Sequence, residues 1–205
     1  MIAKMVKRAA LLGCVALAAG CATAPPTDQN NVCSIFEQYP SWYDNAVKMH
    51  KEWGTPISLA MAFIEQESHF RYDAKPPKHY VLGFIPWGRV STAYGYAQAQ
   101  DPIWDEFLEA TDNGGSRTDF HDALMFIGWY TNKTNRNLHV PFSDTYHQYL
   151  AYHQGYGGFK RKSYLSHPWL LKVAQHVEHD AKRYQAQLHH CRPELERRRL
   201  DSWFF

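Results

Sequence analysis

Residues 57–70 read ISLAMAFIEQESHF, and this stretch decides the fold. Its apolar positions keep the i, i+3, i+4, i+7 spacing of one helix face, and these positions are Ile57, Ala60, Met61 and Ile64. Just before it, Thr55-Pro56 combines a capping hydroxyl with a proline at the first helical position. We therefore expect a helix from about residue 57 whose apolar face turns inward.

Glu67 lies near the end of this helix, where the apolar stripe runs into a carboxylate. Three and four residues beyond Ile64, the spacing reaches Glu67 and Ser68, whereas Gln66 points outward. A carboxyl group at an apolar boundary is disfavoured as an ion, so we expect its pKa to rise toward the range of a general acid. The plain alternative is that Glu67 ends the buried face in water.

The rest of the central region also has helical patterns. Start signals and apolar spacing predict helices over about 41–53, 101–108, 118–130, 143–153 and 169–190. Between Asp73 and Val90, three prolines and two glycines argue against regular structure. We therefore expect a mainly α fold with one long irregular loop.

The first twenty residues carry the features of a secretory signal. Positive residues precede a short apolar run, and residues 17–20 (LAAG) then lead into Cys21. This end resembles the lipobox of bacterial lipoproteins, which implies that Cys21 becomes the first residue and carries lipid. Ala22 in place of Asp after the cysteine resembles sorting to the outer membrane, so a periplasmic, lipid-anchored protein is implied. An ordinary signal with an incidental cysteine is the alternative.

These patterns divide the chain into four parts. We expect a lipoprotein signal over 1–20, the lipidated cysteine with a flexible polar tether over 21–31, one domain over 32–192, and a frayed tail over 193–205. A tail that contacts an anionic lipid surface or a partner is the alternative. Hydrophobic residues make up 45% of the chain, which is enough for a buried core, and a net charge of +2 does not suggest a nucleic-acid binder.

Cys33 and Cys191 bracket the expected domain once Cys14 leaves with the signal and Cys21 is lipidated. In an oxidising compartment two such cysteines are expected to form a disulfide. The alternative is two buried free thiols.

The histidines near the C-terminus raise the question of a metal site. His176 and His179 lie among Lys, Asp and Glu on what the pattern indicates is a solvated face. A metal site needs ligands that converge with defined geometry. We therefore expect neither a metal nor a cofactor.

Two further segments combine aromatic and amide side chains. Residues 91–98 read STAYGYAQ ahead of a helix start, and residues 149–158 read YLAYHQGYGG at a helix end. Aromatic faces and amides suit a sugar-binding groove, because CH faces pack on rings and amides bond to hydroxyl and N-acetyl groups. Each segment alone is equally typical of an ordinary core.

In this order, the three segments resemble the lytic transglycosylases (the SLT domain), which share the goose-type lysozyme fold. Glu67-Ser68 looks like the family's Glu-Ser pair, which contains its one catalytic carboxylate. Residues 93–98 are similar to its Gly-Leu-Met-Gln segment, and residues 151–155 to its Ala-Tyr-Asn-Ala-Gly. The resemblance implies a lysozyme-like helical domain with a substrate groove.

The resemblance also implies roles for individual residues. Glu67 would be the catalytic acid and Tyr152 would orient it. The expected substrate-binding residues are Ser68, Tyr94, Gly95, Gln98, Tyr152 and His153. His153 replaces the family's Asn, and Tyr96 and Ala97 replace Leu and Met, which leaves fine specificity open.

The implied reaction is cleavage of the bond between N-acetylmuramic acid and N-acetylglucosamine in peptidoglycan. Glu67 would protonate the glycosidic oxygen and then take a proton from the sugar's own C6 hydroxyl, which gives a 1,6-anhydro product. The alternatives are a non-catalytic peptidoglycan-binding lipoprotein and a lysozyme-type hydrolase in which Asp73 or Asp101 positions water. The implied partners are glycan strands and, through the anchor, the membrane; envelope protein partners stay open.

Overall fold

The computed structural model describes residues 23–81, 85–112 and 114–201, so the expected signal and Cys21 lie outside the described residues. The described helices are α1 (Val32–Gln38), α2 (Pro40–Trp53), α3 (Ile57–Ser68), α4 (Asp101–Thr111), α5 (Phe120–Leu138), α6 (Thr145–Lys160), the short 3-10 helix η1 (Ser163–Ser166) and α7 (Pro168–Asp201). The mainly α prediction is confirmed. Within the described part of the chain, no helix combines the length and the apolarity needed to cross a bilayer.

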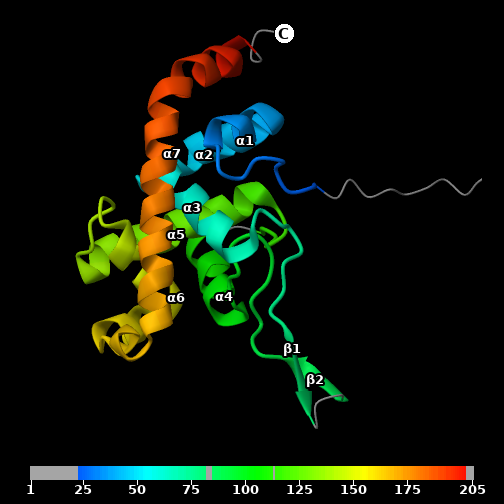
Figure 1. The fold of residues 1–205 in the computed structure, drawn as a ribbon, viewed down its shortest axis with the longest axis vertical. Coiled ribbons are helices and arrows are strands. Elements are labelled where there is room, and N and C mark those ends of the chain that lie inside the picture. The colour runs from blue at the N-terminus through cyan, green and yellow to red at the C-terminus, as the bar shows by residue number, and fades with distance from the viewer. Residues whose placement is uncertain (1–22, 82–84, 113, 202–205) are drawn as a thin grey trace, which may run out of the picture.

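Helix α3 lies at the centre of the fold, with α7 running alongside it (Figure 1). The predicted face of α3 is buried, but so is every other residue from 57 to 64. The expectation of a single inward face is therefore wrong, because α2, α5 and α7 all pack against this helix. Glu65, Gln66 and Glu67 are only partly buried, so the polar end of α3 emerges from the core.

Local sequence accounts for most helix ends. Gly54 has a φ of 75° and ends α2, and Asp119 accepts a hydrogen bond from the Asp122 N–H at the start of α5. Thr55, expected as a cap for α3, does not act as one. Its Oγ1 lies 2.7 Å from Oγ1 of Thr131, which ties the start of α3 to α5.

The stretch predicted as a long irregular loop contains a β-hairpin. Strands β1 (Lys78–Val81) and β2 (Ile85–Arg89) pair antiparallel, with Tyr80 opposite Pro86, and the hairpin projects from the helices (Figure 1). The prediction is wrong here because each strand of a two-stranded ribbon has a free edge, where a proline without an N–H is tolerated.

The N-terminal segment 23–31 lies against the domain. Tyr39 Oη donates to the carbonyl of Ala24 at 2.7 Å, Gln187 Nε2 donates to that of Asn30 at 3.0 Å, and Pro26 is buried. The expectation of a flexible tether is therefore wrong for these residues. Their polar composition suggested a solvated chain, but contacts with side chains from distant segments fix their backbone.

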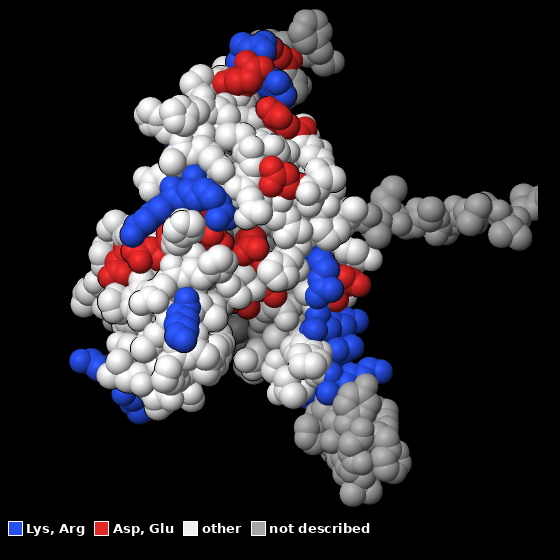
Figure 2. Space-filling view, in the orientation of Figure 1, with Lys and Arg blue, Asp and Glu red and all other residues white. Residues whose placement is uncertain are grey.

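Helix α7 continues through much of the expected tail. It extends to Asp201, with Pro193 inside it and a bend near its C-terminal end (Figure 1). Leu195 is buried, and Tyr43 Oη donates to Glu196 at 2.7 Å. The arginines here pair with acidic side chains of the same helix, and both charges lie together at this end (Figure 2). A frayed tail is therefore wrong for residues 193–201.

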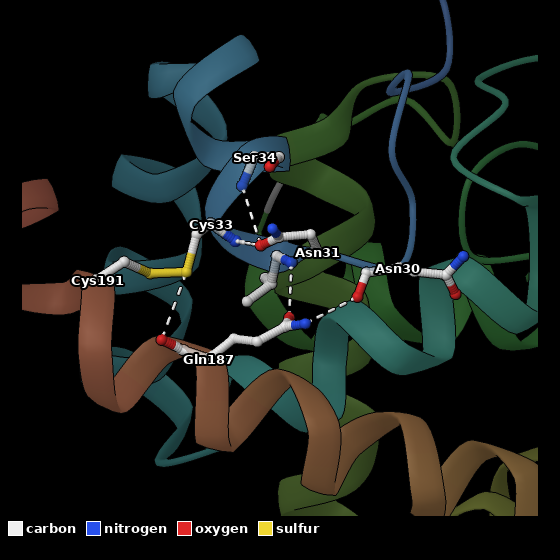
Figure 3. The surroundings of a disulfide bond; sticks show 7 residues. Asn30, Asn31, Cys33, Ser34, Gln187 and Cys191 are labelled. Atoms are coloured by element: carbon white, nitrogen blue, oxygen red, sulfur yellow. Dashed lines mark hydrogen bonds between the residues drawn. A yellow bond between two sulfur atoms is a disulfide. The ribbon is translucent and has the colours of Figure 1, made fainter.

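A disulfide joins Cys33 of α1 to Cys191 of α7, which confirms the predicted bridge (Figure 3). It closes a loop with a sequence separation of 158, and the two Cα atoms lie 6.1 Å apart. One turn earlier on α7, Gln187 accepts a hydrogen bond from the Val32 N–H and donates to Asn30 (Figure 3). The two ends of the domain are thus held together by a covalent bond and by hydrogen bonds.

Candidate active site

A cavity of about 640 Å³ opens at the C-terminal end of α3. Glu67 forms part of its wall, and the rest comes from the segment before α4, from α4 and α5, and from the second half of α6. The three segments singled out in the sequence therefore meet at one place. Among the described residues that line the cavity, Glu67 is the one carboxylate.

The Glu67 carboxyl group has the properties of a general acid and base. Burial raises its pKa from 4.5 to about 7, while a hydrogen bond from Tyr149 opposes that rise. The Tyr149 hydroxyl donates to Glu67 Oε1 at 2.9 Å. Near neutral pH, Glu67 can therefore hold a proton, release it and take it back.

Tyr149, and not Tyr152, holds Glu67 in place. Tyr152 Oη donates to the carbonyl of Ala97 at 2.6 Å, so the expected orienting bond from Tyr152 is absent. Burial, together with the nearby Glu67, raises the pKa of Tyr149, which keeps its hydroxyl a donor. Both tyrosines pack edge-on against Phe63 of α3, with ring centroids 5.2 Å and 5.1 Å away. Residues 149–158 contain both tyrosines one turn apart, and nothing in their sequence shows which of the two reaches Glu67.

Ser68 is not brought to the cavity. Its side chain is buried, and its hydroxyl donates to the carbonyl of Ile64 at 3.0 Å within the same helix. The expected contact with substrate therefore has no support in the geometry. The side chain of the neighbouring Glu67 lines the cavity, whereas the side chain of Ser68 is buried in the core.

Gln98 is part of the cavity lining, whereas Gly95 is not among the lining residues. Gly95 has a φ of 75°, and a Cβ there would lie 1.9 Å from the carbonyl oxygen of Arg117. Gln98 lines the cavity, and its Nε2 donates to the carbonyls of Ala74 at 2.9 Å and Gly95 at 2.8 Å. Tyr94, the third expected residue of this segment, is not among the lining residues.

His153 is an exposed residue of the cavity lining, so it lies at the cavity rim. Burial, and to a lesser degree the neighbouring His167, lower its pKa, which favours the neutral imidazole at neutral pH. Two residues later, Gly155 leaves helical geometry with φ 68° and ψ 166°. Residues on both sides of this kink, from 152 to 157, line the cavity.

Aromatic rings form much of the remaining wall. Phe126 and Tyr130 of α5 line the cavity together with Tyr152 and Tyr156 of α6. Tyr130 and Tyr156 stack with ring centroids 4.8 Å apart. The helical spacing of α5 indicated core positions, so no sequence signal marked its two rings as cavity-lining.

The other carboxylates considered lie away from the cavity. Asp101 pairs with Arg117 at 2.8 Å, and neither Asp101 nor the exposed Asp73 is a lining residue. On the far side of α3, the buried Asp180 lies near Glu65 and the exposed His176 in a group that could hold a cation. Arg183 already pairs with Asp180 at 2.7 Å, so an ion pair accounts for this group.

Comparison with protein families gives one match. A family model described as a transglycosylase SLT domain matches residues 9–191, which include all the segments around the cavity. No match is found among curated proteins or among solved structures. The helical architecture agrees with a lysozyme-like SLT domain, as predicted. The chain belongs to the transglycosylase SLT domain family.

Proposed function

We propose that this protein is a lytic transglycosylase, which cleaves the β-1,4 bond between N-acetylmuramic acid and N-acetylglucosamine without water. The observation that carries the proposal is Glu67, a single carboxyl group with a pKa of about 7 in an aromatic cavity. An ordinary glutamate has already lost its proton near neutral pH. Family membership supports peptidoglycan as the substrate.

The proposed reaction needs only this carboxyl group from the protein. Glu67 gives its proton to the glycosidic oxygen, and the bond from that oxygen to C1 of the muramoyl sugar breaks. The muramoyl N-acetyl oxygen stabilises the cationic C1, in the manner of substrate-assisted glycosidases. The ionised Glu67 then takes the proton of the C6 hydroxyl as its oxygen bonds to C1, which forms the 1,6-anhydro ring and restores Glu67.

Tyr149 is the positioning residue in this scheme. Its bond to Oε1 restrains the carboxyl group, and a hydroxyl donor stabilises the ionised form after the first proton transfer. The aromatic wall offers faces for sugar CH groups. Gln98 holds its loop through its Nε2 group, and its position in the lining supports a role for its amide in binding a sugar.

Two rival functions make different demands on the site. A hydrolase of lysozyme type needs a second carboxylate to position water, and neither Asp73 nor Asp101 lines the cavity. A non-catalytic binder needs the groove, but binding alone does not require the raised pKa of Glu67. Both observations favour the transglycosylase.

We further propose that Cys21 carries lipid and anchors the protein to the periplasmic face of the outer membrane. The LAAG-Cys pattern supports this location, and so does the disulfide, which is typical of oxidising compartments. Substitution of Cys21 by Ser is expected to move the protein from the membrane to the soluble fraction. Unchanged membrane association would argue against the anchor.

The activity is tested on purified peptidoglycan by mass spectrometry of released fragments. The wild-type protein is expected to release fragments, and the Glu67→Gln variant none. Glu65→Gln is a matched control on the same helix, because Glu65 does not line the cavity and bonds to His69 instead. Binding of the polymer by wild type without any fragments would favour the non-catalytic binder.

A further inference from the structure

Trp169, near the start of α7, has a large apolar side chain that is exposed to solvent. Four large hydrophobic side chains are mostly exposed in the described part of the chain, and Trp169 is the one aromatic among them, at 54%. An isolated exposed hydrophobic residue is common and needs no explanation. The position of Trp169, however, links it to the cavity.

A line of rings leads from Glu67 to Trp169. Tyr149 holds Glu67, and its ring centroid lies 6.3 Å from that of His153 at the cavity rim. The His153 ring in turn meets Trp169 edge to face, with centroids 5.3 Å apart. The indole therefore lies just outside the cavity, beside one of its lining residues.

The start of α7 fixes the backbone at Trp169. Pro168 begins α7, and its fixed φ suits the first position of a helix. The N–H groups of Leu170 and Leu171 both donate to the carbonyl of His167, which closes the first turn around Trp169. A rigid aromatic side chain loses little conformational entropy when a ligand packs on it.

We propose that Trp169 forms an outer sugar-binding surface, on which a hexosamine of the same glycan strand packs beyond the sugar that reacts. The inference rests on the proposed function, because a polymer bound at Glu67 must leave the cavity across its rim. Where it crosses beside His153, the exposed indole offers a flat apolar face to the CH groups of a sugar ring. This surface selects for strand length, and the cavity selects the bond that is cut.

The test measures binding by calorimetry with the full-length protein carrying Glu67→Gln, which cannot consume the ligand. The ligands are a peptidoglycan disaccharide and a hexasaccharide. We expect the disaccharide to contact the cavity only and the hexasaccharide to extend past the rim as well. Trp169→Ala is expected to weaken hexasaccharide binding about two- to tenfold and to leave disaccharide binding unchanged. Trp169→Phe should retain most of the affinity. Leu165→Ala, which removes another exposed side chain, should have no effect.

Three results would overturn the inference. Equal hexasaccharide affinity with and without Trp169 would show that the indole does not contact the strand. Equal losses for both ligands would show that Trp169 acts on the cavity through His153. Absence of any glycan binding, together with no cleavage by the wild-type protein, would overturn the proposed function as well.

Discussion

Replacing Glu67 by Gln is expected to stabilise the folded protein at and above neutral pH. Burial raises the pKa of Glu67 from 4.5 to about 7 in the folded state, so the folded protein keeps a proton that the unfolded chain releases. Between pH 4.5 and about pH 7, the free energy of unfolding falls by about 1.4 kcal/mol per pH unit. Above pH 7 the ionised carboxylate, which the cavity shields in part from water, therefore costs about 3 kcal/mol of stability.

Glutamine is a suitable replacement because it has the same shape without the charge. Its side-chain oxygen can still accept the hydrogen bond from Tyr149. Below pH 4.5 Glu67 is protonated in both states, so the wild type and the variant should be about equally stable. The variant should then gain on the wild type as the pH rises, and the gain should level off above pH 7.

Urea denaturation followed by tryptophan fluorescence measures this difference at pH 4, 6 and 8. Glu65→Gln serves as the control, because it makes the same substitution on the same helix outside the cavity lining. A Glu67→Gln variant that is equally stable at all three pH values, or less stable than wild type at pH 8, would refute the reasoning. The carboxyl group would then not be buried as described.

Three further predictions concern the supports of the site. Tyr149→Phe removes the bond that lowers the pKa of Glu67, so the basic limb of the pH profile of kcat/KM should move up by about one unit; an unmoved limb would contradict this. Gly95→Ala places a Cβ 1.9 Å from a backbone carbonyl oxygen at a positive φ, and chemical denaturation should show a loss of at least about 2 kcal/mol. Reduction of the Cys33–Cys191 bridge should lower stability by about 4–5 kcal/mol in the same assay, and a loss below about 1 kcal/mol would show that the bridge constrains little.

The position of Glu67 could be predicted because the signal is local. The helical spacing of the apolar residues from Ile57 to Ile64 extends to Glu67, and it can be read without knowledge of distant contacts. The burial of the opposite side of α3 could not be predicted in this way. It depends on how α2, α5 and α7 pack around α3, and only the tertiary structure supplies that information.

The partner of Glu67 illustrates the limit of a motif. Tyr149 and Tyr152 lie one turn apart on the same helix, and the resemblance favoured Tyr152. Which hydroxyl reaches the carboxylate depends on the tertiary placement of α6, and in this fold it is the hydroxyl of Tyr149. The expected contact of Ser68 with substrate meets a related limit, because its hydroxyl already donates to the carbonyl of Ile64 in its own helix.

The hairpin and the C-terminal helix were missed because composition describes a segment without its contacts. Pro86 suggested a loop, yet it is tolerated in a strand with a free edge. The basic residues after Cys191 suggested a tail, yet Leu195 is buried and Glu196 bonds to Tyr43, more than 150 residues away in sequence. In both places, pairing with another segment determines the structure.

The attack of the C6 hydroxyl on C1 is tested most directly by digesting peptidoglycan in water labelled with heavy oxygen. The masses of the products are then measured by mass spectrometry. If Glu67 takes the proton of the C6 hydroxyl while the C6 oxygen bonds to C1, every new muramoyl end is a 1,6-anhydro sugar and carries no label from water. We expect this result for the wild-type protein and no products for Glu67→Gln. New reducing ends that carry the heavy oxygen would contradict it, because water would then be the nucleophile and a second group would have to activate it.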